Sequence, residues 1–95
     1  ASLAYKQDLE KGDKFGRTPL LLAARNGHVK IISLLLKYKA NINAVDTSGN
    51  SSLHYASSYG FIESLEYLLK QGADPNLPNQ WKTTPFSIAL LKKNF

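Results

Sequence analysis

The side chains that stand out for acid–base catalysis or metal binding are two histidines and two aspartates: His28, His54, Asp13 and Asp46. The histidines lack the short spacing of a paired metal site. A lone histidine rarely acts without an orienting partner, so we expect His54 to be structural rather than catalytic or metal-binding. His28 is interpreted as a partly exposed turn residue. The aspartates have the character of loop-capping residues that accept backbone hydrogen bonds.

The rest of the sequence offers no catalytic constellation. It has no Gly-rich phosphate-binding loop, and no set of Ser, His and Asp residues stands out as a triad. Cysteine is absent, which excludes disulfides, thiolate zinc sites and a cysteine nucleophile. The sequence therefore predicts no catalytic residue, no metal and no cofactor, and this stretch of chain is not expected to be an enzyme.

Composition places the chain among folded, non-membrane proteins. Of its 95 residues, 43% are hydrophobic and 20% are charged. The longest strongly apolar run, residues 19–24, is too short to cross a bilayer. The formal net charge of +5 could steer an acidic peptide, a nucleic acid or a membrane surface toward the protein, and charge alone does not choose among them.

The two aspartates belong to an internal repeat. A shift of 33 residues aligns Asp13 with Asp46 and produces ten identities in one window. The other pairs include Gly16 and Gly49, Leu20 and Leu53, Ala23 and Ala56, Gly27 and Gly60, Leu35 and Leu68, Leu36 and Leu69, Ala40 and Ala73, and Asn43 and Asn76. A third copy starts at residue 79. We therefore divide the chain into an irregular segment or remnant of a preceding repeat (1–12), two whole repeats (13–45 and 46–78) and a partial third (79–95).

Each unit is predicted to be a helix, a tight turn, a second helix and a projecting loop. Hydroxyl side chains and prolines mark the start of the first helix, which spans about residues 19–26 in the first unit. A glycine ends it in a left-handed conformation. The second helix carries apolar residues at helical spacing near residues 29–37 and 62–70. The structural residues predicted in this way are Thr18, Pro19, Gly27, Ser51, His54, Gly60, Thr84 and Pro85.

The segment from Asp13 to His28, with its Thr-Pro-Leu and Ala-Ala-x-x-Gly-His motifs, resembles the ankyrin repeat. The resemblance implies a predominantly helical solenoid of stacked units, with β-hairpin loops called fingers and short helices that line a concave face. It also implies that His54 bridges backbone groups of adjacent loops. The sequence departs from the pattern at Ser52, which replaces a proline, and at Lys82 and Lys39, which replace glycines.

The positions left over after the stack is built form the predicted binding face. They are Lys14, Phe15, Arg17, Arg25, Asn26, Asn50, Tyr59, Gln80, Trp81, Lys82 and Lys92. This set is basic and aromatic, a combination typical of binding anchors, whereas Glu63 and Glu66 fall on an outer helix. The alternative is a solvated basic surface without partner specificity. Trp81 is either an anchor for a partner or packs against a neighbouring finger.

These observations favour a protein–protein interaction module that binds an acidic or mixed peptide. Nucleic-acid binding by the same face is the alternative, although no recognition motif of that class is present. We expect an intracellular protein, cytoplasmic or nuclear, and the absence of cysteine is compatible with a reducing compartment. The resemblance also allows a non-catalytic segment of a larger enzyme such as a kinase or an ADP-ribosyltransferase.

Two further expectations concern the ends of the stack and its loops. The partial third unit predicts apolar residues that its own second helix does not cover. We expect either that the chain is part of a longer protein or that the ends are covered by self-association or by the N-terminal segment. Asn43 and Asn76 resemble asparagines that are hydroxylated in some ankyrin proteins, but a loop hydrogen bond is the favoured interpretation.

Overall fold

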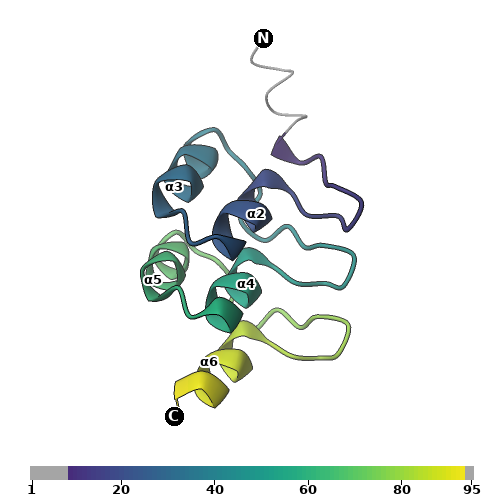
Figure 1. Ribbon diagram of the computed structural model, residues 1–95, viewed down its shortest axis with the longest axis vertical. Helices are drawn as coiled ribbons and strands as arrows, with labels where there is room; N and C mark the ends of the chain where they lie inside the picture. The colour runs from purple at the N-terminus through teal and green to yellow at the C-terminus, as the bar shows by residue number, and fades with distance from the viewer. Residues whose placement is uncertain (1–8, 94–95) are drawn as a thin grey trace.

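The computed structural model describes residues 9–93 of the 95-residue chain. Within that range it contains helices α2 (Pro19–Arg25), α3 (Val29–Lys37), α4 (Ser52–Tyr59), α5 (Ile62–Lys70) and α6 (Pro85–Lys93), and no residue of the range is assigned to a strand (Figure 1). The first helix ends one residue earlier than predicted, because Asn26 caps it.

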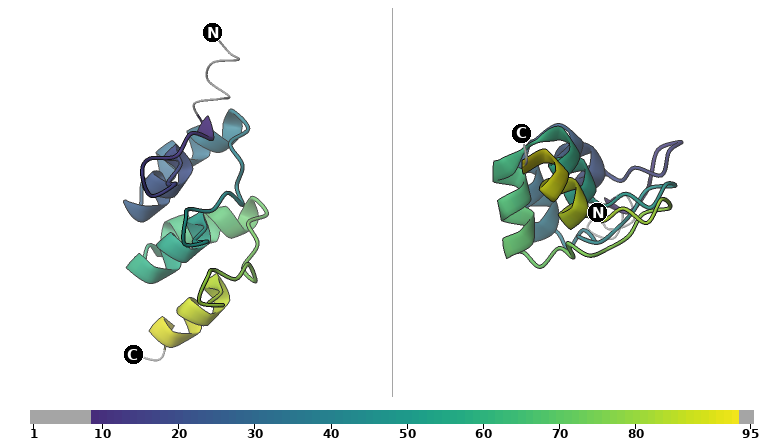
Figure 2. Two further views of the ribbon diagram at one scale, coloured as in Figure 1. Left: turned by 90° about the vertical axis from the view of Figure 1, so that its right-hand side faces the viewer. Right: turned by 90° about the horizontal axis from the view of Figure 1, so that it is seen from below.

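The helices form two rows. In the inner row α2 packs against α4 and α4 against α6, while in the outer row α3 packs against α5. Each outer helix also packs against the inner helix that precedes it in the chain. Loops project from the same side of the inner row at every level (Figure 1, and Figure 2 from below). This arrangement confirms the predicted helical solenoid. The expected β character of the fingers is not confirmed, since each finger is closed as a turn.

The first helix of each unit begins at a hydroxyl side chain, as predicted. Thr18, Ser51 and Thr84 each accept a backbone N–H three residues further on. Pro19 and Pro85 follow two of these caps, where a proline loses no hydrogen bond because the first-turn N–H has no partner in a helix. At the remaining start, the buried Ser52 hydroxyl donates to the carbonyl of Ile42 at 3.4 Å. The missing proline is thus replaced by a contact to the preceding loop.

The tight turn between α2 and α3 requires glycine for two reasons. Gly27 has a φ of 70°, in the left-handed region that residues with a Cβ avoid. A Cβ at Gly27 would also lie 2.7 Å from the ring of Phe61 in the next unit. The His28 N–H then donates to the carbonyl of Ala23, which is left open at the end of α2. Gly60 ends α4 in the same conformation, with a φ of 75°, as the sequence predicted.

Small and branched residues fill the space between the rows. The buried core contains Leu20, Ala23, Ala24, Ile32, Leu53, Ala56, Leu68 and Ala73. Alanines on the inner helices let neighbouring backbones approach closely, and the leucines and isoleucine pack between the rows. No unit of this size can bury its apolar face alone, so stacking supplies most of the stability of the fold.

Two lysines occupy backbone conformations that favour glycine. Lys39, which follows the C-cap of α3, has a φ of 72°, and Lys82, in the third finger, has a φ of 61°. The corresponding positions in other units are glycines, among them Gly72 with a φ of 95°. The structure therefore keeps the turn despite the departure noted in the sequence, at a cost of about 1–2 kcal/mol for each residue with a Cβ.

Buried His54 links two units. Its Nδ1 accepts the Ser51 N–H at 2.9 Å, so the other ring nitrogen, Nε2, carries the proton and donates to the carbonyl of Thr83 at 2.9 Å. The side chain is 2% exposed. The bridge between adjacent loops implied by the sequence is therefore present. A second link joins the units at the base of the loops, where the Asp74 N–H donates to Asn43 Oδ1 at 3.1 Å.

Replacing Lys39 with glycine should stabilise the protein. We expect Lys39→Gly to raise the free energy of unfolding by about 0.5–1 kcal/mol, because removal of the Cβ relieves the left-handed strain by more than the added chain entropy costs. Urea unfolding followed by circular dichroism measures the change. Lys39→Ala is the matched control, since it removes the charge but keeps the Cβ. An equal gain in the alanine variant would show that charge, not backbone strain, is responsible.

Stability should fall on acidification through His54. Burial lowers the pKa of His54 below its ordinary value of 6.5, although its hydrogen bond to the Thr83 carbonyl and the Asp46 carboxylate oppose the shift. The unfolded state therefore takes up a proton near pH 6.5 that the folded state does not. The stabilisation is complete above that pH and decreases below it, by at most about 1.4 kcal/mol per pH unit for one proton.

Urea unfolding measured from pH 7.5 to 5 tests this expectation. His54→Gln should flatten the pH dependence between about 6.5 and 5, whereas His28→Gln, at an exposed histidine, should leave it intact. A His54→Gln protein with the full wild-type slope would show that other groups cause the acid sensitivity.

Candidate partner-binding face

Each finger is closed by one side-chain oxygen at the same repeat position. Asp13, Asp46 and Asn79 supply an Oδ1 that accepts two backbone N–H groups, from the residues two and four places further on. The donors are Phe15 and Arg17 in the first finger, Ser48 and Asn50 in the second, and Trp81 and Thr83 in the third, all at 2.9 Å. The aspartates are therefore loop-capping residues, as predicted, and Asn79 takes the same role.

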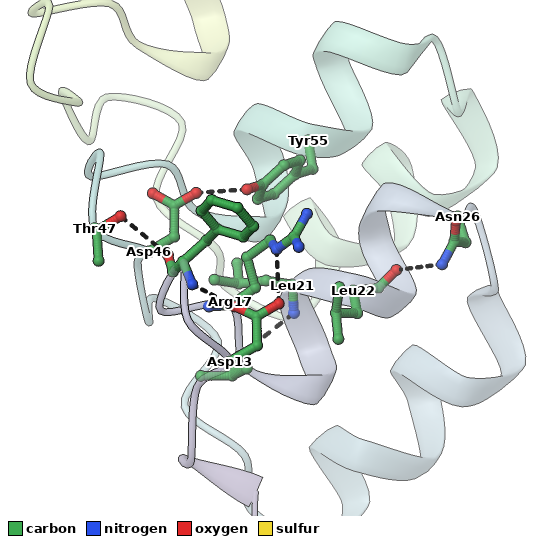
Figure 3. A network of polar contacts seen from close by, with 10 residues as sticks. Asp13, Arg17, Leu21, Leu22, Asn26, Asp46, Thr47 and Tyr55 are labelled. Carbon is green, nitrogen blue, oxygen red and sulfur yellow. Dashed lines mark hydrogen bonds and ion pairs between the residues drawn. The ribbon is translucent and has the colours of Figure 1, made fainter.

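This capping also fixes the charge of Asp13. The backbone N–H of Arg17 lowers the pKa of the Asp13 carboxyl most strongly. Desolvation opposes this shift, and the Phe15 N–H and the Arg17 guanidinium lower the pKa further, so that the net shift is downward. Arg17 Nε lies 2.9 Å from Asp13 Oδ2 (Figure 3). Much of the positive charge of Arg17 is thus balanced within its own finger.

Neighbouring fingers are hydrogen-bonded to one another. The Phe15 carbonyl accepts both the backbone N–H and the hydroxyl of Thr47, at 3.0 and 3.1 Å. The Ser48 carbonyl accepts the N–H of Gln80 at 2.9 Å. Because each finger is also closed internally, the three loops form one ordered edge that holds its exposed side chains in fixed relative positions.

Tyr55 ties the second finger to the inner row. Its hydroxyl donates to Asp46 Oδ2 at 2.5 Å (Figure 3). Burial of the phenol raises the pKa of Tyr55 far above its ordinary value, and the bond to Asp46 raises it further, so Tyr55 stays protonated. Asp46 thus caps its finger with one oxygen and anchors α4 with the other.

Positive side chains lie over the exposed aromatic rings. The Phe15 ring has the Arg17 guanidinium carbon 4.7 Å from its centroid and the Lys14 ammonium nitrogen at 5.3 Å. Arg25, at the end of α2, lies 5.9 Å from the centroid of Tyr59. Arg25 and Tyr59 therefore meet across helices α2 and α4, whereas the contacts of Phe15 stay within the first finger.

A groove of about 340 Å³ lies between the second and third fingers and helices α4 and α6. It is lined by Asn50, His54, Tyr55, Ser58, Tyr59, Asn79, Trp81 and Ile88. Tyr55 and Tyr59 meet edge to face, with ring centroids 6.4 Å apart. Asn79 Nδ2 donates to Asn50 Oδ1 at 2.9 Å across the groove. Aromatic walls and polar amides thus meet in one concave site.

Three of the predicted binding residues, Asn50, Tyr59 and Trp81, meet in this groove. Trp81 is 64% exposed, so most of its ring does not pack against the neighbouring finger. Gln80 and Lys82 lie exposed beside it in the third finger.

The other predicted binding residues are placed differently. Asn26 is occupied as the C-cap of α2, where its side chain donates to the carbonyl of Leu22. Lys92 borders a separate hollow of about 270 Å³ between α5 and α6. Lys14, Phe15 and Arg17 belong to the first finger, and Arg25 reaches the groove only through Tyr59.

The lining includes residues that were absent from the predicted binding set: Tyr55, Ser58, Asn79 and Ile88. Tyr55 and Ile88 hold the same repeat position, 33 residues apart, which Leu22 holds in the first unit. This variable position on the inner helices could have been found by asking which residues of each unit differ while their neighbours agree.

The part of the chain between residues 9 and 93 contains no helix with the length and apolar character of a bilayer span. Nor do three or more His, Asp or Glu side chains gather there as metal ligands would. His54, Asp13 and Asp46 are instead occupied by the backbone and tyrosine hydrogen bonds described above.

Comparison with known proteins agrees with the architecture. No curated protein matches the sequence. A family model described as ankyrin repeats, in three copies, matches residues 2–93. The match spans nearly the whole chain and accounts for the capped inner helices, the glycine turn and the stacked fingers. The chain belongs to the ankyrin-repeat family.

Proposed function

We propose that this protein is a protein-interaction module that binds an extended, acidic or mixed peptide segment across its fingers and inner helices. Ankyrin repeats generally mediate protein binding. The observation that supports a peptide partner at this face is the groove between α4, α6 and the last two fingers, with Tyr59 and Trp81 exposed at its walls. Exposed aromatic residues on a rigid frame can bury large contact areas at a low cost in side-chain entropy.

The charges around the groove support a partner of negative charge. Arg25 lies over Tyr59, and Lys82 follows Trp81 at the tip of the third finger. The nearby Asp46 is engaged by two backbone N–H groups and by Tyr55. Positive charge therefore faces solvent here with little local compensation, which speeds the approach of acidic segments and favours them over basic ones.

Binding, not catalysis, suits the titratable groups of this face. Both nitrogens of His54 are used by backbone groups, and the carboxylates of Asp13 and Asp46 close fingers. A general acid or base needs a free position within hydrogen-bond reach of a reacting group. These side chains are committed to holding the loops instead.

The same face should lose affinity when its anchors are removed. We expect Trp81→Ala and Arg25→Glu each to weaken binding of an acidic peptide about tenfold or more, through lost aromatic contact area and reversed charge respectively. Fluorescence anisotropy of a labelled peptide of about twelve residues that alternates Glu with Pro and Leu measures this effect. Lys30→Glu, the same charge reversal at an exposed position on α3, is the matched control and should change affinity less than about threefold.

Circular dichroism must show that all three variants remain folded. Unchanged affinity in both Trp81→Ala and Arg25→Glu would rule out this face. A single-stranded oligothymidine that binds at low salt, while the peptide does not bind, would instead identify the face as a nucleic-acid surface.

A further inference from the structure

The amide oxygens and the acceptor nitrogen of the groove are already occupied. Asn79 Oδ1 accepts the N–H groups of Trp81 and Thr83, and Asn50 Oδ1 accepts from Asn79 Nδ2. His54 Nδ1 accepts from the Ser51 N–H. Every amide oxygen and acceptor nitrogen on the side chains that line the groove therefore has a partner from the protein itself.

Donors, in contrast, remain available there. The Asn50 side-chain amide has two N–H bonds, and among the described residues neither has a partner. Asn79 donates one of its two side-chain N–H bonds to Asn50, and the other has no partner among the described residues. The Ser58 hydroxyl and the indole N–H of Trp81 likewise have no hydrogen-bond partner within residues 9–93. The bond between Asn79 and Asn50 fixes both amides, so the donors are held in place before a ligand arrives.

The surroundings select among the ligands that such donors could bind. Aromatic side chains of Tyr59 and Trp81 cover the aliphatic part of a bound side chain, and Ile88 on α6 adds an apolar surface. Arg25 and Lys82 supply positive charge nearby, and no Asp or Glu belongs to the lining. A flexible apolar stem that ends in a negatively charged group with two oxygens fits these features best, because hydrogen bonds to a charged acceptor are the strongest.

We propose that this groove is a carboxylate-specific pocket that receives a Glu or Asp side chain of an extended peptide. The carboxylate accepts from the side-chain amides of Asn50 and Asn79 and from the Ser58 hydroxyl, while Tyr59 and Trp81 cover its stem. The inference rests on the proposed function and goes beyond it, since it assigns the acidic preference to one pocket and not to the net charge of the face.

Two peptides that differ only in Glu and Gln test the pocket. Both have about twelve residues and repeat the unit Glu-Pro-Glu-Leu or its neutral twin Gln-Pro-Gln-Leu, with proline to keep them extended. Binding is followed by the fluorescence of Trp81, the only tryptophan in the sequence, and by anisotropy of a label on the peptide. Measurements at about 0.15 and 0.5 M salt separate local hydrogen bonding from long-range attraction, because screening acts mainly on the latter.

We expect the wild type to prefer the Glu peptide about tenfold or more at both salt concentrations. Asn50→Asp replaces the donors with a negative oxygen while it keeps the acceptor for Asn79, and should abolish this preference. Ser58→Ala, at an exposed position, should reduce it about threefold. Asn76→Asp adds the same charge as Asn50→Asp outside the groove and should change binding less than about twofold.

Each other outcome has a distinct meaning. A Glu preference that survives both Asn50→Asp and Ser58→Ala, or that disappears at high salt, overturns the pocket but leaves the interaction module standing. Failure of both peptides to bind the wild type overturns the proposed function as well. If Asn50→Asp does not fold, the result with Ser58→Ala decides the question.

Discussion

The binding face depends on one hydrogen-bonding constraint, repeated three times: a single side-chain oxygen must accept two backbone N–H groups to close each finger. Asp13, Asp46 and Asn79 meet this constraint with the same geometry. Because every finger is closed in the same way, neighbouring fingers bond in register: the carbonyls of Phe15 and Ser48 accept the N–H groups of Thr47 and Gln80. The result is an edge rigid enough to present Trp81 and Asn50 to a partner without a large entropic cost on binding.

The polar groups that might have carried out chemistry are used to hold this edge. His54 joins the start of α4 to the third finger, and Asp46 joins the second finger to Tyr55. A buried polar group is costly unless it is fully hydrogen-bonded, and these groups are. The same hydrogen-bond requirement explains which polar groups remain available in the groove. Because the amide oxygens and His54 Nδ1 are used for structure, the side-chain groups left over at the groove are amide and hydroxyl donors and aromatic rings.

The fold could be predicted from the sequence because the stack-building residues recur. Thr18 and Ser51 as caps, Gly27 and Gly60 as left-handed turns, and His54 as a bridge all follow from repeated positions with a local physical role. The finger geometry was only partly predictable. The turn residues indicated a projecting loop. Each short finger closes through a side-chain oxygen and through a backbone bond such as that from the Asp46 N–H to the Asn50 carbonyl, and the strand ladder that the resemblance implied is not confirmed.

The groove was harder to predict, for a physical reason. Tyr55 and Ile88 both line the groove, but their side chains differ between units, so the repeat marks their position but not their role. Arg17 shows the opposite error. From the sequence alone, Arg17 is interpreted as a free positive charge. In the structure its guanidinium is paired with Asp13. Which donors remain available is a property of the complete hydrogen-bond network, and no single residue type reveals it.

The strained residue at the tip of the third finger shows how stacking constrains the turn of each finger. Gly16 and Gly49 hold this position in the first two fingers, where an added Cβ would lie 3.0 Å from Thr47 N and from Asn79 Cα of the following finger. Both the neighbouring finger and the positive φ therefore favour glycine at this position. Within residues 9–93 no finger follows the third, so the Cβ of Lys82 has no such neighbour, and only the cost of its positive φ remains. A further finger stacked at the same spacing would contact that Cβ. The demand for glycine in the first two fingers therefore comes partly from the finger that follows each of them, and Lys82 shows that the turn itself accepts a side chain.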